Sequence, residues 1–321
     1  MNAIQANGLT KRYGRKLPAP FHRELVPALE DLSLDVREGE IFGFLGPNGA
    51  GKSTMIRLLL GYLHPTAGTA TVLGLDSRRD SVAIRGRVGY LPGGIALYDS
   101  MTGEGLLDYL AALYRRPTPR RAELVERLEM PAATLARPVR DYSRGMRQKI
   151  GIIQALQHDP ELAILDEPTE GLDPLMQLAF YGLLDELRAG GRTIFFSSHV
   201  LSEVERVCDR VAIVRRGRLV ALQDVPSLLA HRKRNVQMRL SGPAPALLGI
   251  PGVSALESRD GFVRCQLEGD MGPFLNAIAG ASVTDLTIEP ARLEEAFLEF
   301  YADDMPSTAP SGGGRPMMRH P

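Results

Sequence analysis

Short apolar runs alternate with amphipathic segments along residues 1–228 of the chain. Glu40–Leu45 (EIFGFL) predicts a buried strand that ends in a glycine-rich turn, and Ser53–Leu63 predicts a helix after it. The same pattern predicts further strands, at Ala70–Leu73, Val88–Leu91, Leu162–Leu165, Thr193–Phe196 and Arg210–Arg215. Strands that alternate with helices in this order are typical of an α/β domain.

A largely helical stretch interrupts the strands at about residues 95–157. The segments LLDYLAALY and RAELVERLEM within it place apolar residues at the spacing of about 3.6 residues that a helix requires. We therefore expect a helical lobe that is inserted between two strands of a mixed core sheet.

Residues 229–302 follow a different pattern, which indicates a second and smaller unit. Val236, Met238 and Leu240 alternate with polar residues, as in a half-buried strand, and Val283–Ile288 repeats the alternation. The predicted order is strand, short helix, two strands, helix, strand and a last helix at Leu293–Tyr301. This order indicates a small α+β domain with a ferredoxin-like arrangement. Residues 303–321 contain the run PSTAPSGGGRP, so we expect a disordered tail there.

Composition narrows the classes of protein to which the chain can belong. Hydrophobic residues make up 44% of its 321 residues and charged residues 24%, which is an ordinary globular balance. Lys and Arg together number 38, as do Asp and Glu, so the formal net charge is zero and we expect no nucleic-acid partner. Cys208 and Cys265 are the only cysteines, which excludes a disulfide framework and favours a reducing compartment.

No segment approaches the run of about 20 apolar residues that a membrane-spanning helix needs. The N-terminal sequence MNAIQANGLTKRYG also lacks the apolar stretch of a secretory signal. We therefore expect an intracellular chain without direct membrane insertion, whose association with a membrane would depend on a partner.

The strongest chemical signal is Gly46–Thr54, GPNGAGKST, which fits the pattern G-x-x-x-x-G-K-[ST] between a predicted strand and a predicted helix. Its glycines allow backbone N–H groups to turn inward around a polyphosphate, and the N-terminus of the helix adds partial positive charge. Lys52 would neutralise the β- and γ-phosphates, while Ser53 would offer a hydroxyl to Mg²⁺. The residues expected at the nucleotide are Gly46, Pro47, Asn48, Gly49, Ala50, Gly51, Lys52, Ser53 and Thr54.

A pair of acidic residues follows the apolar run Leu162–Leu165. A carboxylate at the end of a buried strand, beside a phosphate loop, is suited to hold Mg²⁺, which predicts a metal-binding role for Asp166. Glu167, one position further on, would polarise an attacking water as general base. The alternative is a pair of solvated acids at a strand end.

The segment Tyr142–Lys149, YSRGMRQK, directly precedes an apolar helical pattern. A serine hydroxyl and a glycine N–H at the start of a helix, here from Ser143 and Gly145, form a second candidate anion site. Taken alone, Ser143 would fit an ordinary N-cap equally well.

Together, the phosphate loop, YSRGM, LAILDEPTEGLD and the later SSH resemble the nucleotide-binding subunit of an ABC transporter, over about residues 6–225. The resemblance implies a P-loop ABC ATPase domain, with ATP and Mg²⁺ as its cofactors. It also implies nucleotide roles for residues beyond the phosphate loop, namely Tyr13, Ser143, Gly145, Asp173 and His199.

Each of these residues matches one position of the family's motifs. Tyr13 corresponds to the aromatic residue that stacks on adenine, and its alternative is a buried tyrosine at a strand end. Ser143 and Gly145 correspond to the signature loop, which contacts the γ-phosphate held by the opposite subunit. Asp173 matches the loop that crosses the dimer interface. His199 matches the switch histidine at the γ-phosphate, and its alternative is a surface residue.

The resemblance further implies a homodimer, in which ATP lies between the phosphate loop of one subunit and the signature loop of the other. ATP binding would close this interface and hydrolysis at Glu167 would open it, because only contacts with the γ-phosphate favour the closed state. Such a cycle would drive a separate multi-spanning permease. The subunit would be cytoplasmic, on the inner face of a bacterial cell membrane.

Three features depart from the common family pattern. The signature reads YSRGM in place of LSGGQ, and this variant resembles the bacterial ABC-2 export class. Gly93, in YLPGG, replaces a glutamine that usually touches Mg²⁺, which puts turnover and coupling in doubt but not ATP binding. Arg15–Pro27 contains three prolines where the family has a short hairpin turn, so it predicts a loop that is either solvated or a partner contact.

The C-terminal segment ARLEEAFLEFYADD resembles the endings of ABC-2 drug and polysaccharide exporter subunits. An amphipathic helix that merely covers its own domain is the alternative. We therefore predict the ATP-hydrolysing motor subunit of an ABC-2 type exporter, whose cargo is determined by the permease. The other candidates are a soluble non-transport ABC ATPase and a weakly catalytic ATP-dependent regulator.

Overall fold

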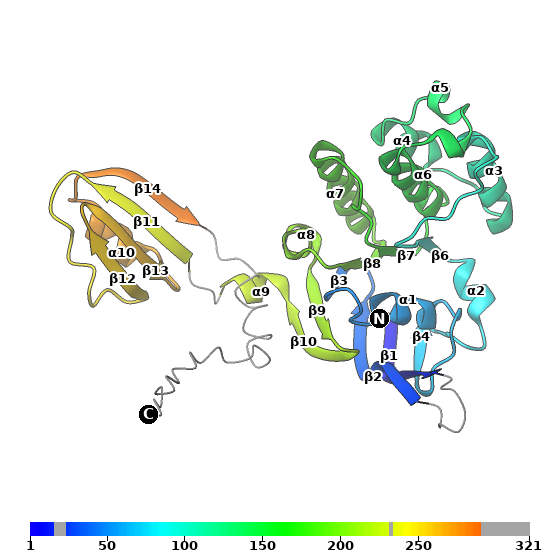
Figure 1. Cartoon of the computed structure of the whole chain (residues 1–321), viewed down its shortest axis with the longest axis horizontal. Helices are drawn as coiled ribbons and strands as arrows, with labels where there is room; N and C mark the ends of the chain where they lie inside the picture. Colours follow the sequence, from blue (N-terminus) through cyan, green and yellow to red (C-terminus); the bar gives the residue numbers. More distant parts are fainter. Residues whose placement is uncertain (16–23, 231–233, 290–321) are drawn as a thin grey trace, which may run out of the picture.

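The computed structural model describes residues 1–15, 24–230 and 234–289, whose strands form three sheets (Figure 1). The first sheet is antiparallel, in the order β2-β1-β4-β5. Its strands are β1 (Asn2–Arg15), β2 (Glu24–Arg37), β4 (Ala67–Val72) and β5 (Leu75–Asp76). Sequence pattern does not predict the β1–β2 pair, because register shifts around Leu9 break the regular alternation of its side chains.

The second sheet has six strands in the order β10-β9-β3-β8-β7-β6. They are β3 (Ile41–Leu45), β6 (Val88–Leu91), β7 (Leu162–Asp166), β8 (Thr193–Ser198), β9 (Arg210–Arg215) and β10 (Arg218–Asp224). All of them except the edge strand β10 run parallel, so β3, β7 and β8 end at the same edge of the sheet. The loops that follow these three strands therefore lie side by side, although they are far apart in sequence.

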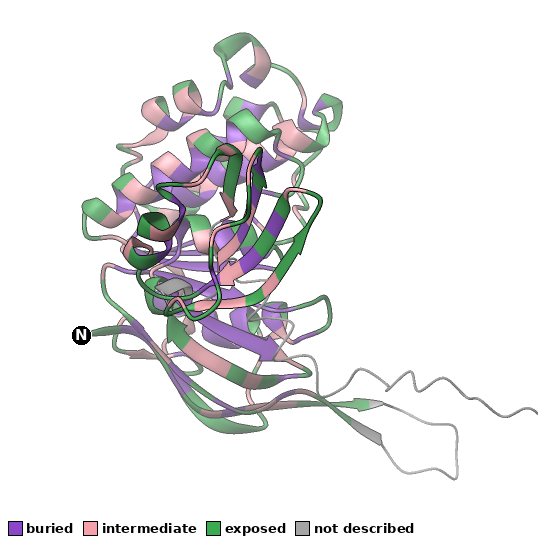
Figure 2. Cartoon of the chain, turned by 90° about the vertical axis from the view of Figure 1, so that its left-hand side faces the viewer, coloured by how far each residue is buried: buried purple, intermediate pink, exposed green. Residues whose placement is uncertain are grey.

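Both faces of the six-stranded sheet are covered, which explains why its strands appear in the sequence as continuous apolar runs. Phe42 and Phe44 pack against Phe195 on the face covered by α1 (Lys52–Leu59) and the first sheet. Ile41, the neighbour of Phe42, points into the core on the helical side. Figure 2 shows the buried residues concentrated in the strands and on the inner sides of the helices.

The predicted helical lobe lies between β6 and β7, as the sequence indicated. It contains α3 (Gly103–Tyr114), α4 (Arg121–Arg127), α5 (Ala132–Leu135), the 3-10 turn η1 (Val139–Asp141) and α6 (Arg144–Leu156). Outside the lobe lie α2 (Ser81–Arg85), α7 (Pro174–Ala189), α8 (Leu201–Val207) and α9 (Val225–Ala230). Lobe and sheet share one apolar core, so the prediction of a mixed core sheet with an inserted helical lobe is confirmed.

The third sheet has the order β12-β13-β11-β14 and is antiparallel throughout. It contains β11 (Arg234–Leu240), β12 (Val253–Arg259), β13 (Phe262–Leu267) and β14 (Val283–Glu289), with α10 (Gly272–Ile278) packed on one face. The strand order is that of a ferredoxin-like sheet. The predicted short helix after the first strand is wrong, because residues 241–252 contain no helix. Pro243, Pro245 and Pro251 lack backbone donors and disfavour helical geometry there.

The predicted loop Arg15–Pro27 is also too long, because β2 already begins at Glu24. Residues 16–23 lie outside the described residues, as do the predicted helix Leu293–Tyr301 and the predicted tail 303–321. We propose that residues 1–228 and 229–302 are separate domains. The apolar core residues of the described parts support this division, since those of the third sheet form a cluster of their own.

Candidate functional site

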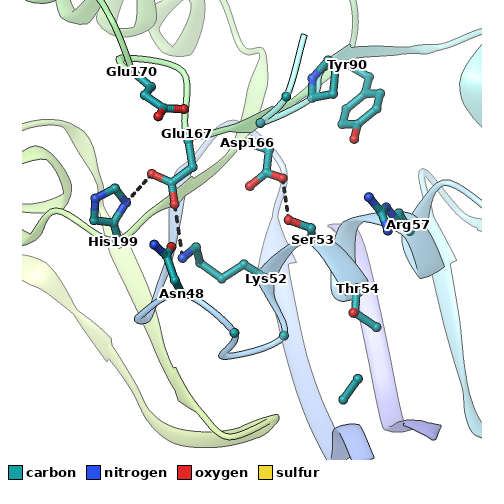
Figure 3. Close-up of a pocket in the computed structure, with 16 residues that line it drawn as sticks. Asn48, Lys52, Ser53, Thr54, Arg57, Tyr90, Asp166, Glu167, Glu170 and His199 are labelled. Carbon is teal, nitrogen blue, oxygen red and sulfur yellow. Dashed lines mark hydrogen bonds and ion pairs between the residues drawn. The ribbon is translucent and has the colours of Figure 1, made fainter. Parts of the chain in front are cut away.

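A cleft of about 530 Å³ lies at the carboxyl edge of the six-stranded sheet (Figure 3). Its main walls are the loop between β3 and α1 and the loops that follow β7 and β8. The lining residues are Ala28, Asn48, Gly49, Gly51, Lys52, Ser53, Thr54, Arg57, Tyr90, Pro92, Gly93, Gly94, Asp166, Glu167, Glu170 and His199.

The loop between β3 and α1 requires glycine for two reasons, which are positive φ angles and close contact with neighbouring backbone. Gly49 and Gly51 have φ angles of 82° and 107°, in the left-handed region that other residues rarely adopt. A Cβ on Gly51 would also lie 2.6 Å from the carbonyl oxygen of Ala28, and one on Gly46 would lie 2.4 Å from that of Val214. The loop is therefore held close to the neighbouring backbone at positions where a side chain does not fit.

Lys52 begins α1, and its side chain turns back into the loop. Its Nζ donates hydrogen bonds to the carbonyl oxygens of Gly46 at 2.7 Å and Pro47 at 3.4 Å. The same Nζ lies 3.2 Å from Oε1 of Glu167. Because the side chain is buried, its charge acts at short range on the cleft with little screening by solvent.

Glu167 lies between Lys52 and His199, with Oε2 at 2.7 Å from Nδ1 of the histidine (Figure 3). An ionised carboxylate can only accept hydrogen bonds, so Nδ1 carries the proton in this contact and Nε2 is left for the cleft. The backbone of Glu167 has a φ of 51°, which costs a non-glycine residue roughly 1–3 kcal/mol. This conformation is held by a hydrogen bond of 3.0 Å from its N–H to the carbonyl oxygen of Ser197.

Asp166 ends β7 and accepts hydrogen bonds from two hydroxyls. Ser53 Oγ donates to its Oδ2 at 2.9 Å, and Ser197 Oγ donates to its Oδ1 at 2.8 Å. Across the cleft, burial and then the charge of Asp166 raise the pKa of Tyr90 to about 12, so this phenol stays neutral. The carboxylate is thus oriented by two neutral donors and has no basic partner among the described residues.

Comparisons with known proteins show the family to which the chain belongs. Residues 29–170 match the ABC transporter family. The chain is 33% identical to the daunorubicin resistance ATP-binding protein DrrA3 of Streptomyces coeruleorubidus, over 94% of this chain and 96% of that protein. It is also 33% identical to the Nod factor export ATP-binding protein I of Mesorhizobium japonicum, over 94% of this chain and 88% of that protein. The chain belongs to the ABC transporter family.

Solved structures give the same result. The chain aligns with an ATP-binding subunit of an ABC transporter at a TM-score of 0.63 and 29% identity, over 70% of this chain and 91% of that one. The predictions of an ABC transporter ATP-binding subunit and of its P-loop ATPase fold are therefore confirmed. No helix in residues 1–15, 24–230 and 234–289 has the length and apolar character to cross a bilayer.

The cleft of this ABC transporter subunit brings together most of the residues that the sequence assigned to the nucleotide. Asn48, Gly49, Gly51, Lys52, Ser53, Thr54, Asp166, Glu167 and His199 all line it. Gly46 and Pro47 contribute through the carbonyl oxygens that hold Lys52. Ala50 is a buried residue of the loop itself.

Four predicted residues lie away from the phosphate loop and do not line this cleft. Ser143 caps the N-terminus of α6 by accepting a hydrogen bond of 3.2 Å from the N–H of Met146. Asp173 caps α7 in the same way, at 3.0 Å from the N–H of Met176. The other two are Gly145, in the first turn of α6, and Tyr13, on β1. Within one subunit, these residues do not meet the phosphate loop.

Sequence reasoning missed several residues that support the site. Ser197 orients Asp166, and Gln148 donates to the carbonyl oxygens of Pro168 at 2.7 Å and Glu167 at 3.4 Å. Ser197 stands in the SSH motif, from which only the histidine had been assigned. Gln148 lies in α6, where the sequence pattern by itself predicts no contact with the loop after β7.

Proposed function

We propose that this ATP-binding subunit hydrolyses ATP and thereby powers export through a separate membrane permease. The proposal rests on two contacts in one cleft: Lys52 pairs with Glu167, and Glu167 is hydrogen-bonded to His199. A buried cation, a carboxylate and an imidazole in this order suit a reaction in which a water attacks a phosphoryl group.

In the reaction, Glu167 acts as the general base. It takes a proton from a water molecule as the water oxygen forms a bond to the γ-phosphorus and the bond to the bridging β–γ oxygen breaks. The products are ADP and inorganic phosphate. Lys52 offsets negative charge on the phosphates, and His199 keeps Glu167 oriented through Nδ1 while Nε2 faces the γ-phosphate.

The donor atoms of Ser53 and Asp166 fit Mg²⁺, and we propose that they hold it. Their oxygens lie 2.9 Å apart, and hydroxyl and carboxylate oxygens are the ligands that this hard cation prefers. Waters and phosphate oxygens would complete the Mg²⁺ shell, since this ion retains waters readily. When bound, Mg²⁺ would offset charge on the β- and γ-phosphates.

We further propose a homodimer in which Ser143, Gly145 and Asp173 act on the nucleotide of the opposite subunit. Their position outside the cleft of their own subunit supports this role. Tyr13 would stack on adenine: the residue is 40% exposed, and β1 pairs with β2, whose Ala28 lines the cleft. An exposed aromatic ring beside a nucleotide site can bury its face against a base.

A second hollow beside the cleft is a candidate contact for the permease. It has a volume of about 230 Å³ and is lined largely by apolar and aromatic residues, among them Ile95, Leu97 and Tyr114. It shares Tyr90 and Pro92 with the nucleotide cleft. A shift of these shared residues on ATP binding would change both surfaces together. It would thereby couple the nucleotide site to the permease.

Export as the direction of transport is supported by the names of the relatives, which include a Nod factor export protein and a daunorubicin resistance protein. The cargo would be determined by the permease. The subunit would then act at the inner face of the cell membrane, held there by its partner.

The test is gentle solubilisation of native membranes followed by purification of this chain. We expect a multi-spanning protein to co-purify at equal stoichiometry, and to be lost when the membranes are washed with a detergent that dissociates the complex. A partnerless dimer in the cytosolic fraction would contradict the transport proposal and favour the soluble ATPase.

Hydrolysis is tested by two variants of the cleft. Glu167→Gln removes the base but keeps the shape of the side chain, so it should bind ATP and accumulate as a dimer that the wild type does not accumulate. Lys52→Ala should fail to bind ATP and remain monomeric. Size-exclusion chromatography with and without ATP distinguishes the two, and normal turnover by Glu167→Gln would contradict the assigned base.

A further inference from the structure

Glu203, in the first turn of α8, lies beneath the loops that carry Glu167 and His199 but does not line the nucleotide cleft. Its side chain is buried, with 8% of the residue exposed. Both carboxylate oxygens accept hydrogen bonds from hydroxyls: Oε2 from Ser198 at 2.6 Å, and Oε1 from Thr169. The two donors come from different places: Ser198 is the last residue of β8, and Thr169 lies in the loop that follows β7.

On the β8 side, the contact fixes the backbone around His199. Ser198 Oγ donates to Glu203 and accepts a hydrogen bond of 2.9 Å from the N–H of Val200. The hydroxyl thus joins the residue before His199 to the residue after it. The orientation of the His199 side chain therefore depends on a hydroxyl that Glu203 holds in place.

On the β7 side, the contact fixes the loop that begins with Glu167. Thr169 is buried and lies two residues after Glu167 in the sequence. Its carbonyl oxygen accepts a hydrogen bond of 3.0 Å from the N–H of Leu172, which closes the turn of this loop. The loop is also tied to Glu167, whose carbonyl oxygen accepts a hydrogen bond of 3.3 Å from the N–H of Glu170, so a displacement of Thr169 would act on the strained backbone at Glu167.

Burial of a carboxylate between two hydroxyls is unfavourable in free energy, because the charge loses its hydration, unless a cation or metal compensates it. Glu203 has no ion pair among the residues that the structure describes. A glutamine side chain offers one acceptor oxygen and one donor nitrogen, so it cannot accept from the two hydroxyls through two separate atoms as the carboxylate does. The arrangement thus ties Ser198 and Thr169 to one carboxylate.

We propose that Glu203 is a positioning residue for ATP hydrolysis, which sets the separation between Glu167 and His199 by holding Thr169 and Ser198. The inference rests on the proposed roles of Glu167 and His199. It predicts an effect on the rate of the chemical step and none on ATP binding, because Glu203 does not line the cleft.

The test compares Glu203→Gln with the wild-type subunit in its complex with the permease. We expect kcat for ATP hydrolysis to fall by about 10- to 100-fold, the range that follows from loss of a hydrogen bond to a charged group. The Kd for ATP, measured without turnover, should change by less than about twofold. Thr169→Val should lower kcat as Glu203→Gln does, whereas Thr169→Ser, which keeps the hydroxyl, should restore it.

Glu40→Gln is the matched control, since Glu40 is a buried carboxylate at the opposite edge of the sheet. It is also 8% exposed, and it accepts hydrogen bonds from the N–H of Arg37 at 2.7 Å and from Arg210 at 3.0 Å. Its substitution should lower the melting temperature and leave kcat unchanged. Melting temperatures of all variants separate loss of folding from loss of positioning.

Two results would overturn the proposal. One is a fall in kcat for Glu203→Gln no larger than that for Glu40→Gln. The other is an additive loss when Glu203→Gln is combined with Thr169→Val, since residues that act through one contact should not add. If Glu167→Gln kept normal turnover, the proposed function itself would fail, whatever the result at Glu203.

Discussion

At the scale of single residues, Gly93 leaves open the space beside the carboxylate that we assign to Mg²⁺. A Cβ at this position would lie 3.1 Å from Oδ2 of Asp166 and 3.2 Å from its Cγ. A longer side chain would therefore start beside the carboxylate of Asp166. In the native chain a water can occupy this space, since Mg²⁺ retains waters readily.

Gly93→Gln should consequently change the ATPase rate by less than tenfold. The new amide would replace one water ligand by another neutral oxygen, and Asp166 would need to move by only a few tenths of an ångström. Steady-state ATPase rates at saturating Mg-ATP measure the effect, with Gly93→Ala as the control for the added Cβ alone. A hundredfold gain would mean that the native site is impaired.

At the scale of elements, Asp173 caps a helix in its own subunit, in addition to its proposed role at the interface of the dimer. Its carboxylate accepts from the N–H of Met176 and starts α7, which has Pro174 at its first position. The N-cap of α6 is formed in the same way by Ser143. Loops that are proposed to meet the opposite subunit are thus fixed by the helices that follow them.

The two tasks of Asp173 can be separated by substitution. Asp173→Asn keeps a good N-cap, so its stability should stay within about 0.5 kcal/mol of the wild type, whereas Asp173→Ala should lose about 1 kcal/mol. If the charge is needed between subunits, both variants should weaken the ATP-dependent dimer equally. Denaturant unfolding and analytical ultracentrifugation measure the two effects. Equal stability of Asn and Ala at this position would contradict the capping role.

At the scale of the whole molecule, His158 links stability to pH. It follows α6, is 5% exposed and stacks on Tyr114 of α3 with ring centroids 4.1 Å apart. Burial, and then the charge of Arg116, lower its pKa from 6.5 to about 4. The folded protein therefore holds His158 neutral in the range where the unfolded chain would protonate it.

A folded-state pKa below the unfolded value gives stability that is present above pH 6.5 and is lost as pH falls toward 4. Between pH 7 and pH 4.5 the loss should be roughly 2–3 kcal/mol. His158→Phe keeps the stacked ring without a titrating group, so its stability should fall less over the same range. Urea unfolding at both pH values measures the difference. Parallel losses in both proteins would contradict this assignment.

The residues that perform local chemistry could be identified from the amino-acid sequence. Gly46–Thr54 predicts a phosphate loop because all the groups that would contact the phosphates are close together in the sequence. The buried strand that ends in Asp166 and Glu167 predicts the acidic pair of the site. The apolar runs of β3, β7 and β8 predict buried strands, because both faces of a parallel sheet are covered. These features depend on spacing along the chain, which the sequence records directly.

Which distant groups meet, in contrast, depends on how the strands pair in the folded protein. The bond between Ser197 and Asp166 spans 31 positions, and that between Thr169 and Glu203 spans 34. Parallel pairing of β7 with β8 brings these partners together, and no periodicity of the sequence encodes a contact across two strands. Glu203 therefore looks in the sequence like any acid in the first turn of a helix, and its burial beneath two loops emerges only when the sheet is formed.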